Sequence, residues 1–232
     1  VHPCSRAFLF LAKLSHCSES FSPSSTVGSR LPPQVLEGPT GGRVEIPGTR
    51  IVLREYRPGP DDETFFLWWN LEEWQYYDEP DLPFERLSRE AYDRRLAERR
   101  RRPAEPDPSS HAWQIDTVEG RHIGFVNYYY LDPEAGRAHV GIGLPEEETW
   151  GQGYGTEALK LLLGHLFGAT GLKEVRTATW TGNGRMKRVA VKCGFRELGR
   201  SPYDTEFSIR GEALERVEYS LSRAEWLGRG GG

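Results

Sequence analysis

Three glycines stand at alternate positions, Gly151, Gly153 and Gly155, directly before a segment with helical periodicity. The N-terminus of a helix exposes unpaired backbone N–H groups and a partial positive charge, and glycines leave room for a polyanion to approach several of these amides. Tight turns also need glycine for positive φ angles, whatever they bind. Glycine spacing alone therefore favours a phosphate-binding turn and a plain structural turn about equally.

The surrounding residues separate one phosphate ligand from another. A P-loop would continue into Gly-Lys-Ser or Gly-Lys-Thr, which this sequence lacks. A dinucleotide-binding turn would have the spacing G-x-G-x-x-G after the first strand of a parallel βαβ unit. Here the turn comes late and follows a predicted antiparallel meander, so ATP and NAD are disfavoured as ligands.

A second motif begins about thirty residues further on, at Asn183, and ends in Gly-Phe195 (NGRMKRVAVKCGF). Together with WGQGYGTEA it resembles the GNAT acetyltransferases. In that family an Arg or Gln, two spacers, Gly, one spacer, and Gly or Ala precede the third helix, and an Asn…Gly-Phe segment follows. Gly153 and Gly155 fill the two small positions, and Trp150 stands where Arg or Gln is usual. The sequence is most similar to the branch of ribosomal-protein-alanine and polyamine acetyltransferases.

The resemblance covers roughly residues 49–223 and implies acetyl-CoA as the co-substrate. Family members splay two neighbouring parallel strands, here 137–144 and 174–180, so that the pantetheine arm lies in the opening. By resemblance, the backbone at Ile142 and Leu144 and the side chain of Asn183 contact the arm, although Asn183 is equally suited to a plain helix N-cap. The cofactor-binding residues implied at the turn are Trp150, Gly151, Gln152, Gly153, Tyr154, Gly155 and Thr156, and the amides from Gly151 to Thr156 are assigned to the pyrophosphate.

Acetyl transfer to an amine needs a group that removes a proton, because an amine with a pKa near 10 is mostly protonated at neutral pH. Many relatives place a Glu near the start of the fourth strand, where this sequence has His139, a residue type that titrates near neutrality. A structural strand histidine explains His139 equally well. The Tyr that serves as the acid in much of the family is replaced by Ala190. Cys193 is predicted to be a buried helix end rather than a nucleophile.

An aromatic and acidic segment lies where relatives bind the acceptor, in the early helices and the loop between them. It contains Trp68, Trp69, Trp74, Tyr76, Tyr77, Asp78, Glu79 and Asp81. Such a wall suits a cationic amine, such as a polyamine, an aminoglycoside or a protein N-terminus. A tryptophan-anchored helix with a solvated acidic loop would show the same residues.

The resemblance implies an N-acetyltransferase that moves an acetyl group to a primary amine of a small molecule or protein N-terminus, by direct attack on the thioester. The alternative from a different class is a GNAT fold that binds or senses acyl-CoA without turnover. The absent Tyr and the His in place of Glu favour this alternative.

The elements that must position these residues follow from hydrophobic periodicity. Strands are predicted at 50–56, 112–117, 122–131, 137–144, 174–180, 195–199 and 216–222, and helices at 61–76, 87–102, 156–167 and 185–193. This order is that of an α/β (α+β) GNAT fold. We expect a mixed, mostly antiparallel, twisted sheet of about six to seven strands, flanked by about four helices and split between its fourth and fifth strands.

The chain of 232 residues suits one domain, expected at 49–223. Residues 1–48, rich in Ser, Pro and Gly, are predicted to be a disordered extension or a segment upstream of the true start, and residues 224–232 a flexible tail. A net charge of −4 argues against a nucleic-acid partner. Three cysteines without a CxxC pair suggest a reduced, cytoplasmic protein without a metal, and no segment predicts a membrane span. The sequence leaves a homodimer open.

Overall fold

The computed structural model describes residues 45–101, 111–132 and 134–230. The strands are β1 (Glu45–Pro47), β2 (Ile51–Arg54), β3 (His111–Thr117), β4 (His122–Asp132), β5 (Arg137–Gly143), β6 (Glu174–Trp180), β7 (Arg196–Phe207) and β8 (Ala213–Ser222). The helices are α2 (Pro60–Trp69), α3 (Glu72–Asp78), α4 (Arg89–Arg101), α5 (Tyr154–Ala169), α6 (Gly184–Lys192) and α7 (Arg223–Gly228), with a 3₁₀ turn η1 (Glu147–Thr149). Most of the expected N-terminal extension, residues 1–44, lies outside the described residues.

The described strands form one mixed sheet of eight in the order β1-β2-β3-β4-β5-β6-β8-β7. Only the β5–β6 pair is parallel, and the other neighbours in this sheet are antiparallel. The expected GNAT fold is confirmed, with one strand more than predicted. The additional strand is β1, in which Ile46 pairs with Leu53. A strand of three residues is too short to show a hydrophobic period, so the sequence did not predict it. The sheet therefore begins four residues before the boundary expected at Thr49.

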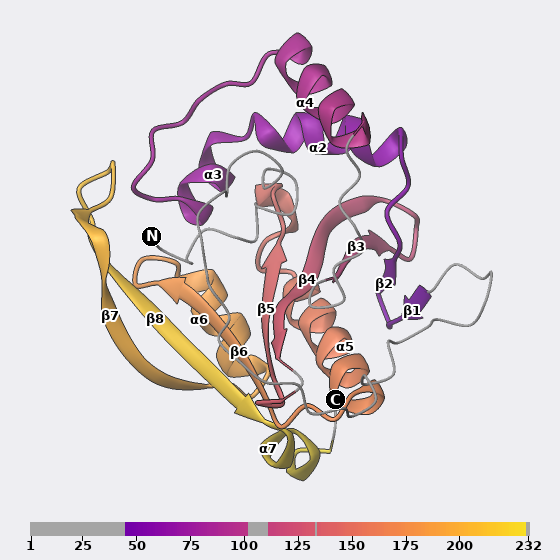
Figure 1. Ribbon diagram of the computed structural model, residues 1–232, viewed down its shortest axis with the longest axis vertical. Helices are drawn as coiled ribbons and strands as arrows, with labels where there is room; N and C mark the ends of the chain where they lie inside the picture. Colours follow the sequence, from indigo (N-terminus) through magenta and orange to yellow (C-terminus); the bar gives the residue numbers. More distant parts are fainter. Residues whose placement is uncertain (1–44, 102–110, 133, 231–232) are drawn as a thin grey trace, which may run out of the picture.

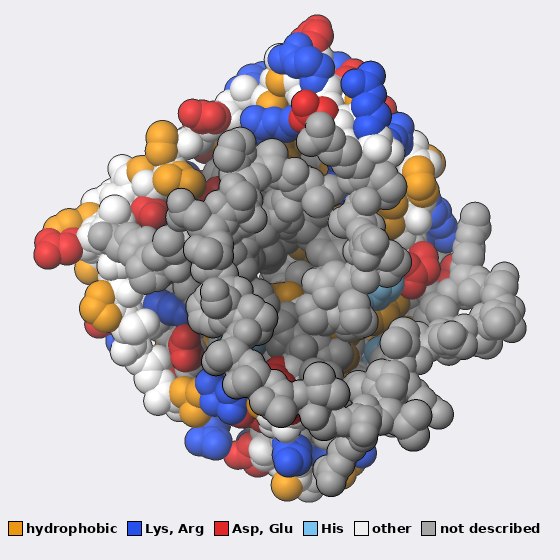
Figure 2. Space-filling view, in the orientation of Figure 1, with side chains coloured by type: hydrophobic (Ala, Val, Ile, Leu, Met, Phe, Trp, Pro, Cys, Tyr) orange, Lys and Arg blue, Asp and Glu red, His pale blue; other side chains and the backbone are white. Residues whose placement is uncertain are grey.

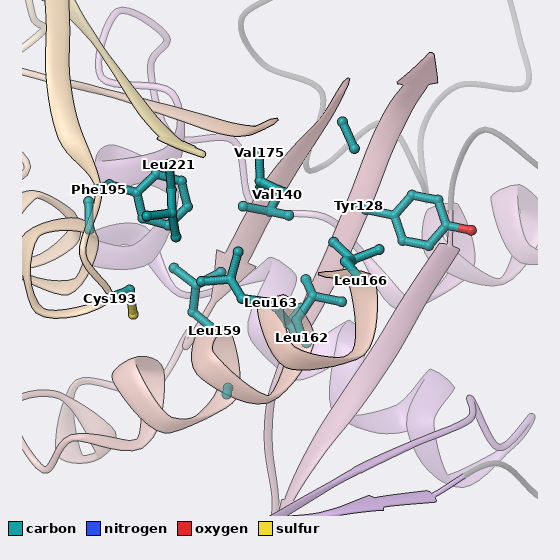
Figure 3. Close-up of a cluster of buried hydrophobic side chains, with 14 of the residues drawn as sticks. Tyr128, Val140, Leu159, Leu162, Leu163, Leu166, Val175, Cys193, Phe195 and Leu221 are labelled. Atoms are coloured by element: carbon teal, nitrogen blue, oxygen red, sulfur yellow. The ribbon is translucent and has the colours of Figure 1, made fainter. Parts of the chain in front are cut away.

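Helices α5 and α6 cover one face of the sheet (Figure 1). The predicted apolar stripe of α5 is completely buried, at Ala158, Leu159, Leu162, Leu163 and Leu166. Figure 3 shows the labelled leucines of this stripe pointing from the helix toward side chains of β5, β6 and β8. This packing is the main apolar contact that fixes where α5 begins, and hence where the glycine turn lies.

Helices α2, α3 and α4 lie along one end of the sheet, where they share a second apolar cluster with Phe125 of β4 (Figure 1). The sequence predicted a single helix over 61–76, but the chain breaks between α2 and α3 at Asn70. The Asn70 side chain donates to the Leu87 carbonyl at 3.2 Å and accepts from the Leu87 amide at 2.9 Å. Its amide is thus bound to a segment 17 residues away, a contact that local periodicity cannot reveal.

The charged face of this end belongs to α4, over which Lys and Arg side chains gather in the upper part of Figure 2. Arg100 pairs with Asp62 at 2.5 Å and Arg89 with Glu63 at 2.5 Å, which ties α4 to the acidic first turn of α2. None of the helices in the described ranges is both long and apolar enough to cross a bilayer.

The C-terminal segment forms a further helix, α7, where a flexible tail was expected from residue 224. Ser222 caps this helix and Glu225 closes the reciprocal hydrogen bond of a capping box. Trp226 is buried, with its ring centroid 6.1 Å from that of Phe167. One tryptophan with a good cap is enough to hold a six-residue helix that has no periodic stripe.

A carboxylate, that of Glu174, links the parallel strands β5 and β6 at one end; Glu174 with its three hydrogen-bond donors is called the Glu174 clasp below. Glu174 of β6 accepts from Arg137 of β5 at 2.9 Å, from Arg176 at 3.0 Å and from the Ser220 hydroxyl of β8 at 2.6 Å. Burial alone would raise the pKa of Glu174, but Ser220, Arg176 and Arg137 outweigh it and lower the pKa to about 2. Three strands therefore converge on one ionised group at this end of the sheet.

Replacing Glu174 by Gln removes the charge of this clasp and keeps its size. We expect the free energy of unfolding at pH 7 to fall by about 1 to 2 kcal/mol, because two ion pairs are lost. The folded pKa lies below the unfolded value of 4.5, so the wild-type carboxylate stabilises the fold above that pH and loses its contribution as the pH falls toward 2. Urea unfolding should thus show a smaller difference between wild type and variant at about pH 3 than at pH 7.

A matched control is Glu197→Gln, which removes an exposed partner of Arg200 on β7. This change should leave the free energy of unfolding nearly unaltered at both pH values, as is usual for exposed ion pairs. An equal effect of Glu174→Gln at both pH values would contradict the clasp.

Candidate functional site

Strands β5 and β6 pair over only part of their length. Their register joins three residue pairs, Arg137 with Glu174, Ala138 with Val175, and His139 with Arg176. Beyond His139 the strands diverge, and the Thr177 hydroxyl donates to the Val140 carbonyl at 2.9 Å. This is the split expected between the fourth and fifth predicted strands, and it opens at the end opposite the Glu174 clasp.

A cavity of about 420 Å³ lies at the open end of the split. Its walls come from α3, from the end of β5, from the turn that leads into α5, and from α6. The lining residues are Trp74, Tyr77, Asp78, Ile142, Gly143, Leu144, Thr149, Trp150, Gly151, Gly153, Gly155, Thr156, Asn183, Arg185, Met186, Arg188, Val189 and Lys192. Eight of the eleven site residues predicted from the sequence are brought together here.

The glycine turn has the backbone that its sequence predicted. Gly151 has φ 74° and Gly153 has φ 88°, both in the left-handed region that side chains disfavour. Gly153 is the N-cap residue of α5. Gly155 is buried in the first turn of that helix, where a Cβ would come within 3.4 Å of the Leu144 side chain. The first amides of α5 therefore lie at the cavity wall, with no side chain on Gly151, Gly153 or Gly155 between them and the cavity.

Two residues of the turn, Gln152 and Tyr154, are absent from the cavity lining. The Gln152 carbonyl accepts from Arg50 at 2.7 Å, and the Arg50 guanidinium carbon lies 5.2 Å from the Tyr154 ring centroid. Glu157 in turn accepts from the backbone amides of Thr49 and Arg50 at 2.7 and 2.8 Å. These contacts hold the outer side of the turn against the segment that leads into β2.

Trp150, which departs from the family's usual Arg or Gln, fixes the turn from the inside. Its indole Nε1 donates to the Leu144 carbonyl at 2.6 Å, which links the turn to the end of β5. The Arg185 guanidinium carbon lies 3.5 Å from the Trp150 ring centroid and 3.8 Å from that of Tyr77. Cation–π attraction holds a guanidinium in such a place. The positive charge of Arg185 therefore lies beside Trp150, the position at which the family usually has Arg or Gln.

Helix α6 contributes most of the cavity's positive charge. Asn183 caps the helix by accepting from the Met186 amide at 3.0 Å, so its expected capping role is confirmed, and it lines the cavity as well. Arg185, Arg188 and Lys192 all line the cavity. Arg185 Nη2 is buried and has no hydrogen-bond partner among the described residues. A buried, unused guanidinium donor is well suited to an anionic ligand.

The aromatic and acidic segment expected to bind the acceptor divides between two roles. Trp74, Tyr77 and Asp78 reach the cavity. The remaining aromatic residues of that segment serve the framework: Trp68 donates to Glu146 at 2.8 Å, the Tyr76 hydroxyl donates to Glu212, and the Arg95 guanidinium carbon lies 5.7 Å from the Trp69 ring centroid. Trp180 Nε1 donates to the Tyr77 carbonyl at 3.0 Å, which anchors the end of α3 to β6.

Three further sequence-based assignments concern the chemistry. His139 lies at the last paired position of the split and does not line the cavity; burial first, then Arg216 and Arg176, lower its pKa. Ala190 is completely buried, so no acid stands where the family usually has Tyr. Burial raises the pKa of the Cys193 thiol to about 12, and this cysteine is buried at the end of α6 as expected. Its thiol stays protonated at neutral pH, which suits packing and not attack.

The residues that sequence reasoning missed are the cations of α6. Arg185, Arg188 and Lys192 recur at a spacing of three and four, which places them on one helical face beside the capping Asn183. That spacing could have identified them. No local signal indicated that Tyr77, more than 100 residues away, would stack on Arg185. The described residues contain no group of three or more metal-ligating side chains.

Comparison with known proteins agrees with this geometry. A family model described as an acetyltransferase (GNAT) domain matches residues 50–196. The uncharacterized N-acetyltransferase YoaA of Bacillus subtilis (strain 168) is 26% identical over 103 residues, which cover 40% of this chain and 58% of that protein. The chain thus matches little more than half the length of this curated relative.

Two solved structures share the fold. One is RimL, a ribosomal L7/L12 alpha-N-protein acetyltransferase in complex with coenzyme A, with a TM-score of 0.60 and 17% identity. The other is a spermidine N-acetyltransferase from Vibrio cholerae in complex with CoA and spermine, with a TM-score of 0.60 and 16% identity. Each match covers 77% of this chain and 98% of the matched chain. Because the family model matches more than half of its residues, the chain belongs to the GNAT acetyltransferase family.

Proposed function

We propose that this chain is an acetyl-CoA-dependent N-acetyltransferase that acts on a primary amine of a small molecule or a protein N-terminus. One observation carries the proposal. The cavity at the split between β5 and β6 joins the N-terminus of α5 and the cations of α6 to an aromatic and acidic wall from α3. A polyanionic donor fits the first part and a cationic acceptor fits the second.

The donor would lie along the β5 edge of the opening. Its pyrophosphate would meet the first amides of α5 between Gly151 and Thr156, together with Arg185 and Arg188. Backbone carbonyls two residues apart on a strand point to the same edge. The Val140 and Leu144 carbonyls accept from Thr177 and Trp150, so the carbonyl of Ile142 between them faces the opening as well. It is the natural partner for an amide of the pantetheine arm.

The chemistry would be a direct displacement. The neutral amine attacks the thioester carbonyl carbon, a backbone amide on the opened strand stabilises the oxyanion, and the thiolate leaves. The two structural relatives act on a protein N-terminus and on spermidine, by their descriptions. Both acceptors are amines, and the Trp74 ring in the cavity lining is of the kind that attracts a cationic one.

A second candidate is an acyl-CoA-binding or sensing module without turnover. Ala190 in place of an acid, and His139 outside the cavity lining, favour this candidate. Acetyl-CoA consumption with a panel of polyamines, aminoglycosides and peptides separates the two, because only the enzyme forms acetylated amines. A cytoplasmic location and a homodimer stay predictions.

Titration calorimetry of acetyl-CoA into the full chain tests the donor site. We expect wild type to bind, and Arg185→Gln to raise the dissociation constant by about 10- to 100-fold, since a buried charge-assisted hydrogen bond contributes about 1.5 to 3 kcal/mol. The loss should be larger at low salt than at high salt, because phosphate contacts are screened.

The matched control for this prediction is Arg196→Gln, on the exposed side of β7, where the arginine pairs with Glu225 at 3.1 Å. Its affinity for acetyl-CoA should equal that of wild type. Wild-type affinity in Arg185→Gln would show that the buried guanidinium serves only to pack Trp150 and Tyr77.

The sequence-based assignment of His139 as the proton acceptor is tested by His139→Ala. A base in this reaction contributes about 10² to 10⁴ in rate, so such a loss in kcat with unchanged acetyl-CoA affinity would support the assignment. From its position outside the cavity lining we expect instead a loss of less than about tenfold. Steady-state kinetics on the best amine of the panel decides between these results.

A further inference from the structure

Asp78 is the last residue of α3 and lies in the aromatic and acidic wall that α3 contributes to the cavity. Its Oδ2 is buried and has no hydrogen-bond partner among the described residues. A buried carboxylate oxygen without a donor is costly, by about 1 to 3 kcal/mol, and native structures rarely keep one without a use. The rest of α3 gives no structural reason for an acid here, since Trp74 and Tyr76 already anchor the helix through buried rings.

The charges around Asp78 are distributed unevenly. Glu79 is its neighbour in the chain, and the cations that line the cavity come from α6, namely Arg185, Arg188 and Lys192. None of these cations forms an ion pair with Asp78 in the part of the chain that the structure describes. Arg185 is instead held between the Trp150 and Tyr77 rings. The end of β5 and the glycine turn add no charged side chain to the lining.

Burial, and to a lesser extent the charge of Glu79, raises the pKa of Asp78 to about 7. A group with such a pKa is ionised in a large fraction of molecules at neutral pH and still binds a proton well. This is the property that a general base needs at its working pH. A cationic ligand beside Asp78 would favour its ionised form further.

We propose that Asp78 binds the ammonium group of the acceptor and takes the proton that must leave before the amine attacks. This inference rests on the proposed acetyltransferase function and deepens it. The orphaned oxygen and the place of Asp78 in the same cavity as the split end of β5 carry it. The aromatic ring of Trp74, which also lines the cavity, would complete the acceptor subsite.

The step balances as follows. The Asp78 carboxylate takes one proton from the ammonium, and the freed lone pair on nitrogen forms a bond to the thioester carbonyl carbon. The carbon–sulfur bond then breaks, and its electron pair leaves on sulfur. The second proton of the attacking nitrogen neutralises the thiolate, and Asp78 releases its proton to water. The products are an N-acetylated amine, free thiol and one proton.

Asp78→Asn is the decisive variant, because it keeps the shape and removes the base. We expect kcat/KM for the amine to fall by about 10² or more, with acetyl-CoA affinity unchanged in calorimetry. In wild type, kcat/KM should rise with pH through about 7, since the carboxylate must be ionised. In the variant this step should vanish, leaving only the rise toward the amine's own pKa near 10. The melting temperature should not fall, because a buried orphan charge is lost.

Asp93→Asn is the matched control, an identical substitution at an exposed position of α4 that pairs with Arg89. It should keep the wild-type rate and pH profile. If Asp78→Asn kept the wild-type rate and pH profile, the role of Asp78 alone would be overturned. That result would be clearest if His139→Ala lowered kcat by about 10²-fold or more. A wild-type chain that binds acetyl-CoA and acetylates no amine would overturn the proposed function and this role together.

Discussion

The site depends on one constraint, which is that two parallel strands separate while their backbone groups keep hydrogen-bond partners. Unpaired buried carbonyls are costly, so a split sheet needs substitutes along its open edge. Here a hydroxyl from Thr177 reaches Val140 and the indole of Trp150 reaches Leu144. At the opposite end, Glu174 draws three strands together. The opening is thus bounded at both ends by hydrogen bonds of the chain itself.

Much of this arrangement could be predicted because it depends on residues that are close together in the sequence. The stripe of α5 and the glycines before it specify a helix start at one place, and β3 to β6 end within one or two residues of their predicted bounds. The break at Asn70 could not be predicted, since its cause is a contact with Leu87. The short elements β1 and α7 were not predicted from the sequence for a related reason. Each is held by pairing or by one buried ring, and neither is long enough to show a period.

The candidate site divides in the same way. The glycine turn and Asn183 carry a recognisable spacing, and the structure places them around one cavity. The Arg185 position depends on Tyr77 and Trp150, residues from two other parts of the chain, so only the fold brings them together. Trp150 stands at the turn position where the family usually has Arg or Gln, and the Arg185 guanidinium carbon lies 3.5 Å from its ring centroid. The cation of this site thus comes from α6, and the Trp150 ring at the turn holds it in place.

The two sides of the cavity carry opposite charge. Cations and helix amides occupy the side made by α5 and α6, and Asp78 with its aromatic neighbours occupies the side made by α3. Within a partly desolvated space such an arrangement acts strongly, because fewer waters screen it. An isolated acid and an unused guanidinium donor both reduce the stability of the empty protein. Ligands of opposite sign, a polyanion on one side and an ammonium on the other, would satisfy both groups at once. Of the six buried side-chain polar atoms without a hydrogen-bond partner among the described residues, the two that belong to cavity-lining residues, on Asp78 and Arg185, therefore lie where the two substrates of an acetyl transfer would meet.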